Sequence, residues 1–327
     1  MGLAEAGVAL AVALPFGLGL TAAAPDDDAP VLRFADPEIV ESSGLVARDG
    51  LLQTVNDSGD EARVFTVDRS GRTVGVTRWA AAPVDVEALA PGPPGRVWVG
   101  DIGDNAEERD GVVVTSVPVG RGEVSGTVES YRLAYPDGAT DAETLLAHPR
   151  TGRLYVVTKG VLGGEVLAAP RELDAEGVNR LRPVGRSLAL ATDGAFLPDG
   201  RHVVLRDYGR AVVYRFPSFT EVSEVPLPPQ RQGEGLAVDD RGRLLVSSEG
   251  PRAPVYAVDL PPRVAPATAA EDEAGDRTPS ASPSPEPLPE PAPDPASSAR
   301  PDVRSWLIGA GILVAMVVVL LRSLRPR

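Results

Sequence analysis

The chain has 327 residues and a formal net charge of −14. A strongly acidic surface repels nucleic acid and anionic lipid, so neither is expected as a partner of the folded part. Cysteine is absent, which excludes a disulfide framework, a thiolate metal site and a cysteine nucleophile.

Residues 1–24 are expected to be a signal peptide. An apolar run at residues 8–20 is too short to span a bilayer comfortably, and it is followed by the small residues Thr-Ala-Ala-Ala and then by three aspartates. The segment before the run carries Glu5 and no basic residue, which departs from the usual pattern. A start codon assigned too far downstream would explain that departure. A buried apolar strand or helix is the alternative interpretation.

Residues 30–261 are predicted to form an all-β domain, a β-propeller, because one pattern recurs in register. An acidic or small residue opens an apolar run, and a glycine turn, a second β-rich run and a third run follow. These openings lie 44, 56, 50 and 41 residues apart, and a four-stranded blade needs about 40 to 50 residues. An extended outer strand or insertion at residues 122–138 is expected to account for the long second interval. The opening positions are Ser43, Glu87, Glu143, Asp193 and Glu234.

Five blades are expected from these repeats. The runs are rich in Val, Leu, Ile and Tyr and are bounded by Asp-Gly and Arg-Gly turns, as in strands. The last repeat has only three runs, and residues 31–34 would supply its fourth strand and close the ring without an open edge. A sixth blade built from irregular pieces is one alternative. A two-sheet sandwich is another, but it does not explain the register.

The C-terminal part is expected to be a stalk followed by a membrane anchor. Proline occupies every second position at residues 283–295, so residues 262–304 favour an extended, unpacked conformation. Residues 305–324 are predicted to be a transmembrane helix. The arginines at its end place the tail, residues 325–327, in the cytoplasm and the propeller outside the cell membrane.

One mouth of the propeller channel is predicted to be acidic. The first strand of each blade lines the channel, and its beginning shares a face with the end of the second strand. The opening positions therefore supply the predicted metal ligands, which are Glu87, Glu143, Asp193 and Glu234. The second-strand ends supply the predicted ligand-binding residues, which are Asp57, Asp101, Asp104, Lys159, Arg206, Asp207 and Glu249.

Neighbouring carboxylates raise each other's pKa or require a cation, and oxygen ligands suit Ca²⁺ or Mg²⁺ better than Zn²⁺. Ca²⁺ is therefore the expected cofactor. Two alternatives stay open: these acids bond neighbouring amides in turns, or one pair is catalytic. No hydrolase, metalloprotease or nucleotide-binding motif occurs, and His148 and His202 are expected on the opposite face.

Six segments carry a family resemblance: residues 42–68, 85–90, 98–105, 141–159, 191–200 and 232–238. They resemble exported bacterial β-propellers near the phytase-like and SdiA-regulated propeller groups. The resemblance implies the propeller fold over residues 30–260, and the phytase-like group implies calcium-dependent phosphoester hydrolysis. Calcium-dependent propeller phytases have six blades and dense basic clusters, whereas this chain has five repeats and one lysine, Lys159.

Three hypotheses for function follow. The first is a membrane-tethered, extracytoplasmic propeller that binds an extracellular ligand or protein at its acidic mouth through Ca²⁺. The second is a metal-dependent phosphoesterase or other hydrolase at the same mouth. The third is a structural module of the cell envelope.

Overall fold

The computed structural model describes residues 29–57, 59–262 and 264. Within this part every regular element is a strand, and the strands form five sheets. No helix among the described residues is long and apolar enough to cross a membrane. The predicted signal peptide, transmembrane helix, tail and nearly all of the predicted stalk lie outside the described residues.

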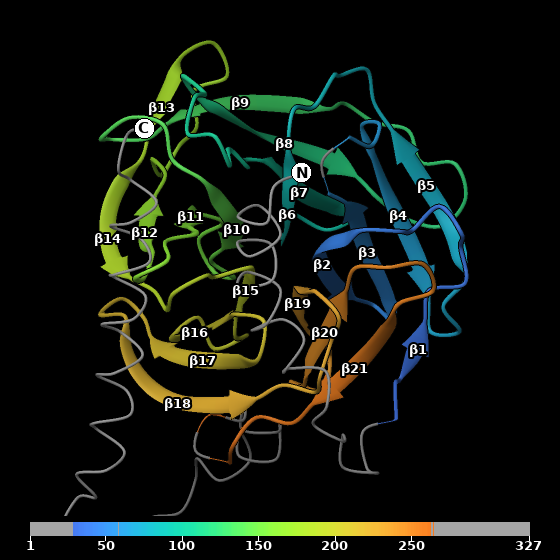
Figure 1. The fold of residues 1–327 in the computed structure, drawn as a ribbon. Coiled ribbons are helices and arrows are strands. Elements are labelled where there is room, and N and C mark those ends of the chain that lie inside the picture. The colour runs from blue at the N-terminus through green and yellow to red at the C-terminus, as the bar shows by residue number, and fades with distance from the viewer. Residues whose placement is uncertain (1–28, 58, 263, 265–327) are drawn as a thin grey trace, which may run out of the picture. The chain divides into compact units, whose positions relative to one another are not determined.

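The five sheets are the blades of a β-propeller, arranged around a central channel (Figure 1). Blades 1 to 4 follow one another along residues 42–226, except that one short strand of blade 2 comes from within the blade 3 segment. Blade 5 takes the last three strands and the first.

The strands of blade 1 are β2 (Ser42–Arg48), β3 (Leu51–Asn56), β4 (Arg63–Asp68) and β5 (Thr73–Arg78). Those of blade 2 are β6 (Val86–Pro91), β7 (Arg96–Asp101), β8 (Val112–Pro118), β9 (Glu129–Ala134) and β13 (Val178–Arg180). Those of blade 3 are β10 (Ala142–Ala147), β11 (Leu154–Thr158), β12 (Glu165–Ala168) and β14 (Arg182–Arg186). Those of blade 4 are β15 (Asp193–Phe196), β16 (His202–Arg206), β17 (Arg210–Arg215) and β18 (Thr220–Pro226). Those of blade 5 are β19 (Gly233–Val238), β20 (Leu244–Ser248), β21 (Pro254–Val258) and β1 (Leu32–Arg33).

The prediction of five blades closed by the N-terminal strand is confirmed. Leu32 pairs with Val255 in an antiparallel register, so β1 forms the outer strand of blade 5. Next to it, the fully buried Phe34 packs in a core shared by blades 1 and 5. The two ends of the propeller are thereby joined in one sheet, and the closing strand leaves no open seam in the ring.

Turn chemistry and apolar alternation explain the local structure. Between β2 and β3, Asp49 and Gly50 have φ values of 54° and 71°, the two-residue turn that matches strand twist and that Asp-Gly favours.

The inner strands β2, β6, β10, β15 and β19 start at one mouth of the channel and end at the other. Apolar side chains between neighbouring blades form the core, as where Leu146 and Val157 of blade 3 join Phe196 and Val203 of blade 4.

Blade 2 has a fifth strand that the repeat pattern does not predict. The short strand β13 comes from the connection between β12 and β14 of blade 3, and it pairs in parallel with β9. Asn179 fixes this crossing, because its side-chain amide donates to the Arg132 carbonyl at 3.0 Å. The connection therefore ties the outer edge of blade 2 to blade 3.

Candidate metal centre

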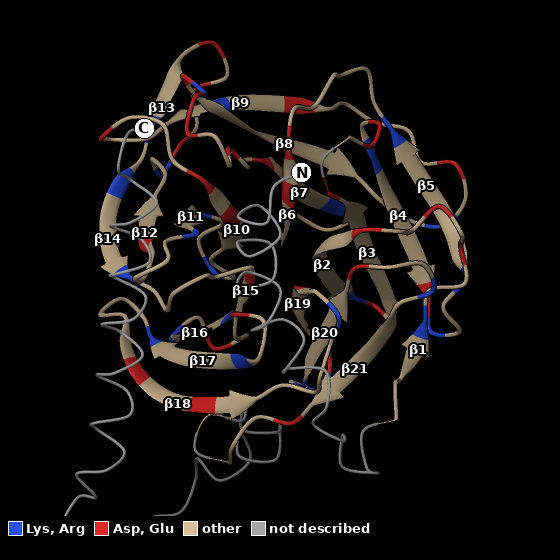
Figure 2. Ribbon diagram, viewed as in Figure 1, with Lys and Arg blue, Asp and Glu red and all other residues tan. Residues whose placement is uncertain are grey.

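Three glutamates lie buried at the start of inner strands. Glu87 on β6, Glu143 on β10 and Glu234 on β19 are 4 %, 4 % and 6 % exposed. Acidic segments mark the inner strands β6 and β10 in Figure 2. Each glutamate interacts electrostatically with the other two, so their carboxylates face a common mouth of the channel.

The tightest cluster of carboxylates at this mouth consists of Asp57, Asp85 and Glu87. Each offers a carboxylate oxygen, and these oxygens lie within 4.8 Å of one another. Asp57 follows β3 directly, and Asp85 immediately precedes β6. The cluster thus joins the end of a second strand in blade 1 to the start of the first strand in blade 2.

Gly103 makes the close approach of two of these carboxylates feasible. A Cβ atom at this position would lie 2.5 Å from Asp85 Oδ2 and 2.7 Å from Glu87 Oε1. Any side chain here would therefore displace both carboxylates. The glycine leaves the space between them open.

The cluster is costly to ionise without a cation. Burial, followed by repulsion from Asp57 and Asp141, raises the pKa of Asp85 to about 6. Burial and the Asp57 and Glu143 charges raise the pKa of Glu87 to about 11. Like charges in a desolvated mouth take up protons or bind a cation.

Glu143 is only partly neutralised. The Lys159 ammonium donates to Glu143 Oε1, whereas the buried Glu143 Oε2 has no hydrogen-bond partner among the described residues. Burial raises the pKa of Glu143 to about 8 against the opposing Lys159 charge. Burial alone would lower the pKa of Lys159, but the Glu143 carboxylate raises it. The Lys159 ammonium also lies 5.7 Å from the centroid of the Tyr208 ring.

Glu234 and Glu249 complete the acidic mouth from blade 5. Burial raises the pKa of Glu234 to about 7, with the Lys159 and Arg206 charges opposing the rise. Burial and the Asp57 charge also raise the pKa of Glu249. The mouth thus combines groups that titrate near neutral pH with a single lysine.

Two of the predicted site residues are committed to backbone groups. Asp193 is fully buried, and its two oxygens accept the N–H groups of Leu236 at 2.6 Å and Gly194 at 2.7 Å. The buried Arg206 donates to the Gly235 carbonyl at 3.1 Å. Both side chains therefore hold blade 4 against blade 5.

Three predicted ligand-binding aspartates shape the loops around the mouth. Asp101 Oδ1 accepts the Asp85 N–H at 2.9 Å and Arg109 Nη2 at 2.8 Å. The Asp104 carboxylate accepts the Arg109 N–H at 2.8 Å. The Asp207 carboxylate accepts two N–H groups of its own turn, each at 2.9 Å.

The structure therefore brings Glu87, Glu143 and Glu234 together and ties Asp193 to backbone amides. The metal and ligand roles of all these residues stay predictions. The sequence pattern did not predict a ligand role for Asp85, and it did not single out Gly103 or Tyr208. The glycine could have been suspected, because it comes two residues after a second strand that ends in Asp101.

No family model matches the chain, and no curated protein matches it. Similar solved structures include a gluconolactonase from Xanthomonas campestris, with 13% identity, a TM-score of 0.45, and coverage of 74% of this chain and 99% of that one. A calcium-binding protein, regucalcin from Agrobacterium tumefaciens, shows 16% identity and a TM-score of 0.41, covering 71% and 94% of the two chains. A virginiamycin B lyase from Staphylococcus aureus shows 9% identity and a TM-score of 0.38, covering 72% and 74%. These neighbours are β-propeller proteins, and no sequence match supports the phytase-like or SdiA-regulated grouping.

Proposed function

We propose that this propeller binds Ca²⁺ at its acidic channel mouth and presents the cation-loaded mouth to an extracellular ligand or protein. The observation that carries the proposal is the cluster of Asp57, Asp85 and Glu87, whose carboxylate oxygens lie within 4.8 Å of one another. An all-oxygen donor set suits a hard divalent cation, and Ca²⁺ accepts the irregular geometry that loop carboxylates offer.

The charge balance at the mouth supports a bound cation. Lys159 partly neutralises Glu143, whereas no basic side chain of the described part forms an ion pair with the buried Glu87. Glu143 Oε2, buried and without a partner among those same residues, is a further oxygen available at this mouth. A divalent cation would compensate repulsion that protons otherwise relieve.

The cation would leave room for a ligand. Ca²⁺ takes six to eight oxygen ligands, and the three clustered carboxylates provide only part of such a shell. Water or an oxygen-bearing ligand would complete it from the open side of the mouth. This chain's residues would then position the ligand through the cation, with the Lys159 ammonium beside it.

We also place the propeller outside the cell, tethered to the cell membrane by residues 305–324. The uncharged, apolar run at residues 306–321 within that segment, together with Arg322, Arg325 and Arg327, supports this topology. The proline-rich residues between the propeller and that segment would serve as a spacer.

A second candidate function at the same mouth is metal-dependent hydrolysis, with phosphoesters as the first substrates to test. The specific observation is that burial raises the pKa of Glu234 to about 7 and that of Asp85 to about 6. Carboxylates that titrate near neutral pH beside a cation can exchange protons with a bound water or leaving group.

The test compares two glycine substitutions on the same face. Gly103→Ala introduces the Cβ atom that would lie 2.5 Å from Asp85 Oδ2, whereas the Cβ of Gly209→Ala would come no closer than 4.0 Å to its nearest neighbour. The full chain, purified without chelator, is analysed for metal content and titrated with Ca²⁺ by calorimetry. Gly103→Ala should weaken Ca²⁺ binding about tenfold or more, equal to about 1.4 kcal/mol, and Gly209→Ala should not.

Absence of both metal and calcium-dependent heat in the wild-type chain would overturn the proposal. A panel of phosphoesters with and without Ca²⁺ separates the two functions. Bound metal with turnover favours the hydrolase, and bound metal without turnover favours the binding module.

A further inference from the structure

The opposite mouth of the channel contains a cavity of about 630 Å³. The inner strands begin at the acidic mouth, and their last residues line this cavity. On β6, for example, Glu87 lies near the start and belongs to the acidic cluster, whereas Leu89 and Pro91 face the cavity. The two sites therefore lie at opposite ends of the same strands.

Small residues create the volume of this cavity. Ala147 is the last residue of an inner strand, Ala47, Ala195 and Ala237 are each next to last in theirs, and Gly194 precedes Ala195. Protein interiors are normally filled to the density of organic crystals. Larger apolar side chains at these positions would fill the channel, so the alanines keep it open.

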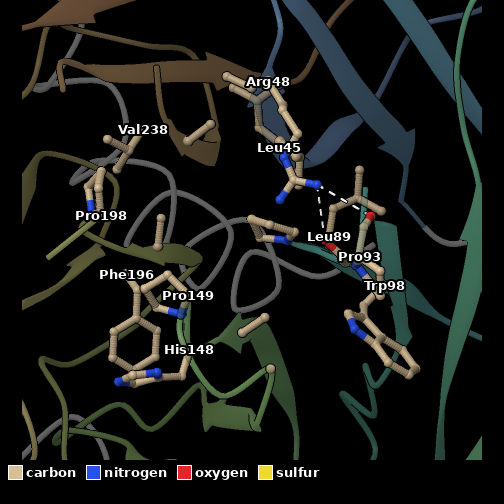
Figure 3. A pocket seen from close by; sticks show the side chains of 18 of the residues that line it. Leu45, Arg48, Leu89, Pro93, Trp98, His148, Pro149, Phe196, Pro198 and Val238 are labelled. Atoms are coloured by element: carbon tan, nitrogen blue, oxygen red, sulfur yellow. Dashed lines mark hydrogen bonds between the residues drawn. The ribbon is translucent and has the colours of Figure 1, made fainter. Parts of the chain in front are cut away.

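The walls of the cavity are mainly apolar. Leu45, Leu89, Trp98, Phe196 and Val238 surround it in Figure 3. Water in such a space finds few hydrogen-bond partners, so an apolar molecule that displaces it gains free energy. The volume also falls within the range of about 300–1,000 Å³ that is typical of small-molecule sites.

Two of the polar side chains at the wall are already engaged. His148 Nε2 contacts the Gly200 carbonyl at 3.1 Å, and His148 Nδ1 accepts the Arg150 N–H at 3.3 Å. Arg48 Nη1 donates to the Gly92 carbonyl at 3.0 Å, one of the contacts drawn in Figure 3. The histidine and this nitrogen of the arginine are thus held by the protein itself.

The apolar surface at this mouth is recessed. None of the large hydrophobic residues that are exposed in the described part of the chain lines the cavity. The rim consists of stiff turns that contain Pro93, Pro94, Pro149 and Pro198. A recess with a stiff rim admits a small molecule, whereas a protein surface needs apolar groups that project.

We propose that this second mouth is a binding site for a small, predominantly apolar molecule, and that it functions independently of the acidic mouth. The molecule's apolar body would contact Leu45, Leu89 and Phe196, and any polar end would stay at the rim near Arg48. This site does not depend on a bound cation.

The test uses 3-trifluoromethyl-3-phenyldiazirine, a neutral apolar photoaffinity probe, on the full chain. Mass spectrometry maps the labelled peptides, and those that cover residues 45–49, 89–98, 147–152 and 194–198 should carry label. The double variant Ala195→Leu and Ala237→Leu fills the cavity and should reduce this labelling about tenfold, because the added side chains occupy the space in which the probe would bury its own apolar surface. The control Ala175→Leu adds the same side chain at an exposed position outside the cavity and should change nothing.

Val238→Thr keeps the shape of the wall and replaces a methyl group with a hydroxyl. It gives a second readout if the filling variant fails to fold, and it should reduce the labelling about threefold. Two results would overturn the proposal. One is the absence of label on these peptides in the wild type. The other is equal labelling of these peptides in the wild type and in whichever of the two variants folds. Because none of these substitutions changes an acidic residue, calcium titration of the same variants reports separately on the cation site.

Discussion

Replacing Glu87 with glutamine tests whether the ionised form of this carboxylate destabilises the fold in the absence of a cation. Its pKa is raised from the ordinary 4.5 to about 11 by burial and by neighbouring acidic groups. Without a cation, the folded state therefore retains the proton that the unfolded chain loses above pH 4.5. The free energy of unfolding that depends on Glu87 is therefore highest below pH 4.5 and falls as the pH rises toward 11.

The size of this loss of stability follows from the difference between the working pH and the pKa of Glu87 in the unfolded chain. At pH 7 the unfolded glutamate lies about 2.5 pH units above its pKa, and each unit is worth about 1.4 kcal/mol, so the native state loses about 3 kcal/mol. Glutamine does not ionise and escapes this loss. In chelator at pH 7, Glu87→Gln should melt about 6 to 12 °C above the wild type, and at pH 5 the difference should be small.

Calcium should remove that advantage. A cation at about 100 times its Kd stabilises the wild type by about 2.7 kcal/mol, and at about 1,000 times by about 4.1 kcal/mol. The Glu87→Gln variant has lost a ligand and should gain less stability from Ca²⁺. The melting temperatures of the two proteins should therefore converge as Ca²⁺ increases, and the wild type should then melt higher. Calorimetric melts at both pH values, with chelator and with Ca²⁺, provide the measurement, and the exposed Glu123→Gln serves as a control.

Two results would refute this reasoning. If the variant and the wild type melt at the same temperature in chelator at both pH 5 and pH 7, ionisation of Glu87 does not destabilise the folded state. An equal shift by Ca²⁺ in both proteins would mean that Glu87 is not a ligand.

The stabilities of Lys159 and Glu143 variants should be strongly coupled. Lys159→Met alone should lower the free energy of unfolding, measured with denaturant at pH 8, by about 3 kcal/mol, because it leaves a buried carboxylate unpaired. Adding Glu143→Gln should restore most of this loss. Additive effects of the two substitutions would contradict this coupling. Phe34→Ala should destabilise the propeller by about 3 to 5 kcal/mol, because this fully buried ring packs beside the closing strand, and a loss under about 1 kcal/mol would argue against closure by β1. For the proposed topology, a cysteine introduced at Ser297 should react with an impermeant reagent on intact cells, whereas one at Ser323 should not, and the reverse pattern would exclude the tether as oriented here.

The fold could be predicted because its signals are local and repeated. Each blade carries its own Gly turns and apolar runs, so the five openings from Ser43 to Glu234 count the blades without any knowledge of contacts. The closing strand at residues 31–34 was predictable for a related reason, since the fifth repeat lacks one strand. The crossing of β13 to blade 2 was not, because three residues held partly by the Asn179 side chain have no periodicity of their own.

The location of the acidic mouth follows from strand alternation and repeat register, so the position of Glu87, Glu143 and Glu234 near one mouth could be predicted from residue order. Which acids cluster tightly could not, because that depends on side-chain partners in other blades. Asp193 occupies the same repeat position as Glu87, yet it accepts two backbone amides, while Asp85 approaches Glu87 across a glycine. A repeat aligns backbones, whereas hydrogen bonds between blades and the space left by Gly103 determine which oxygens remain available for a cation.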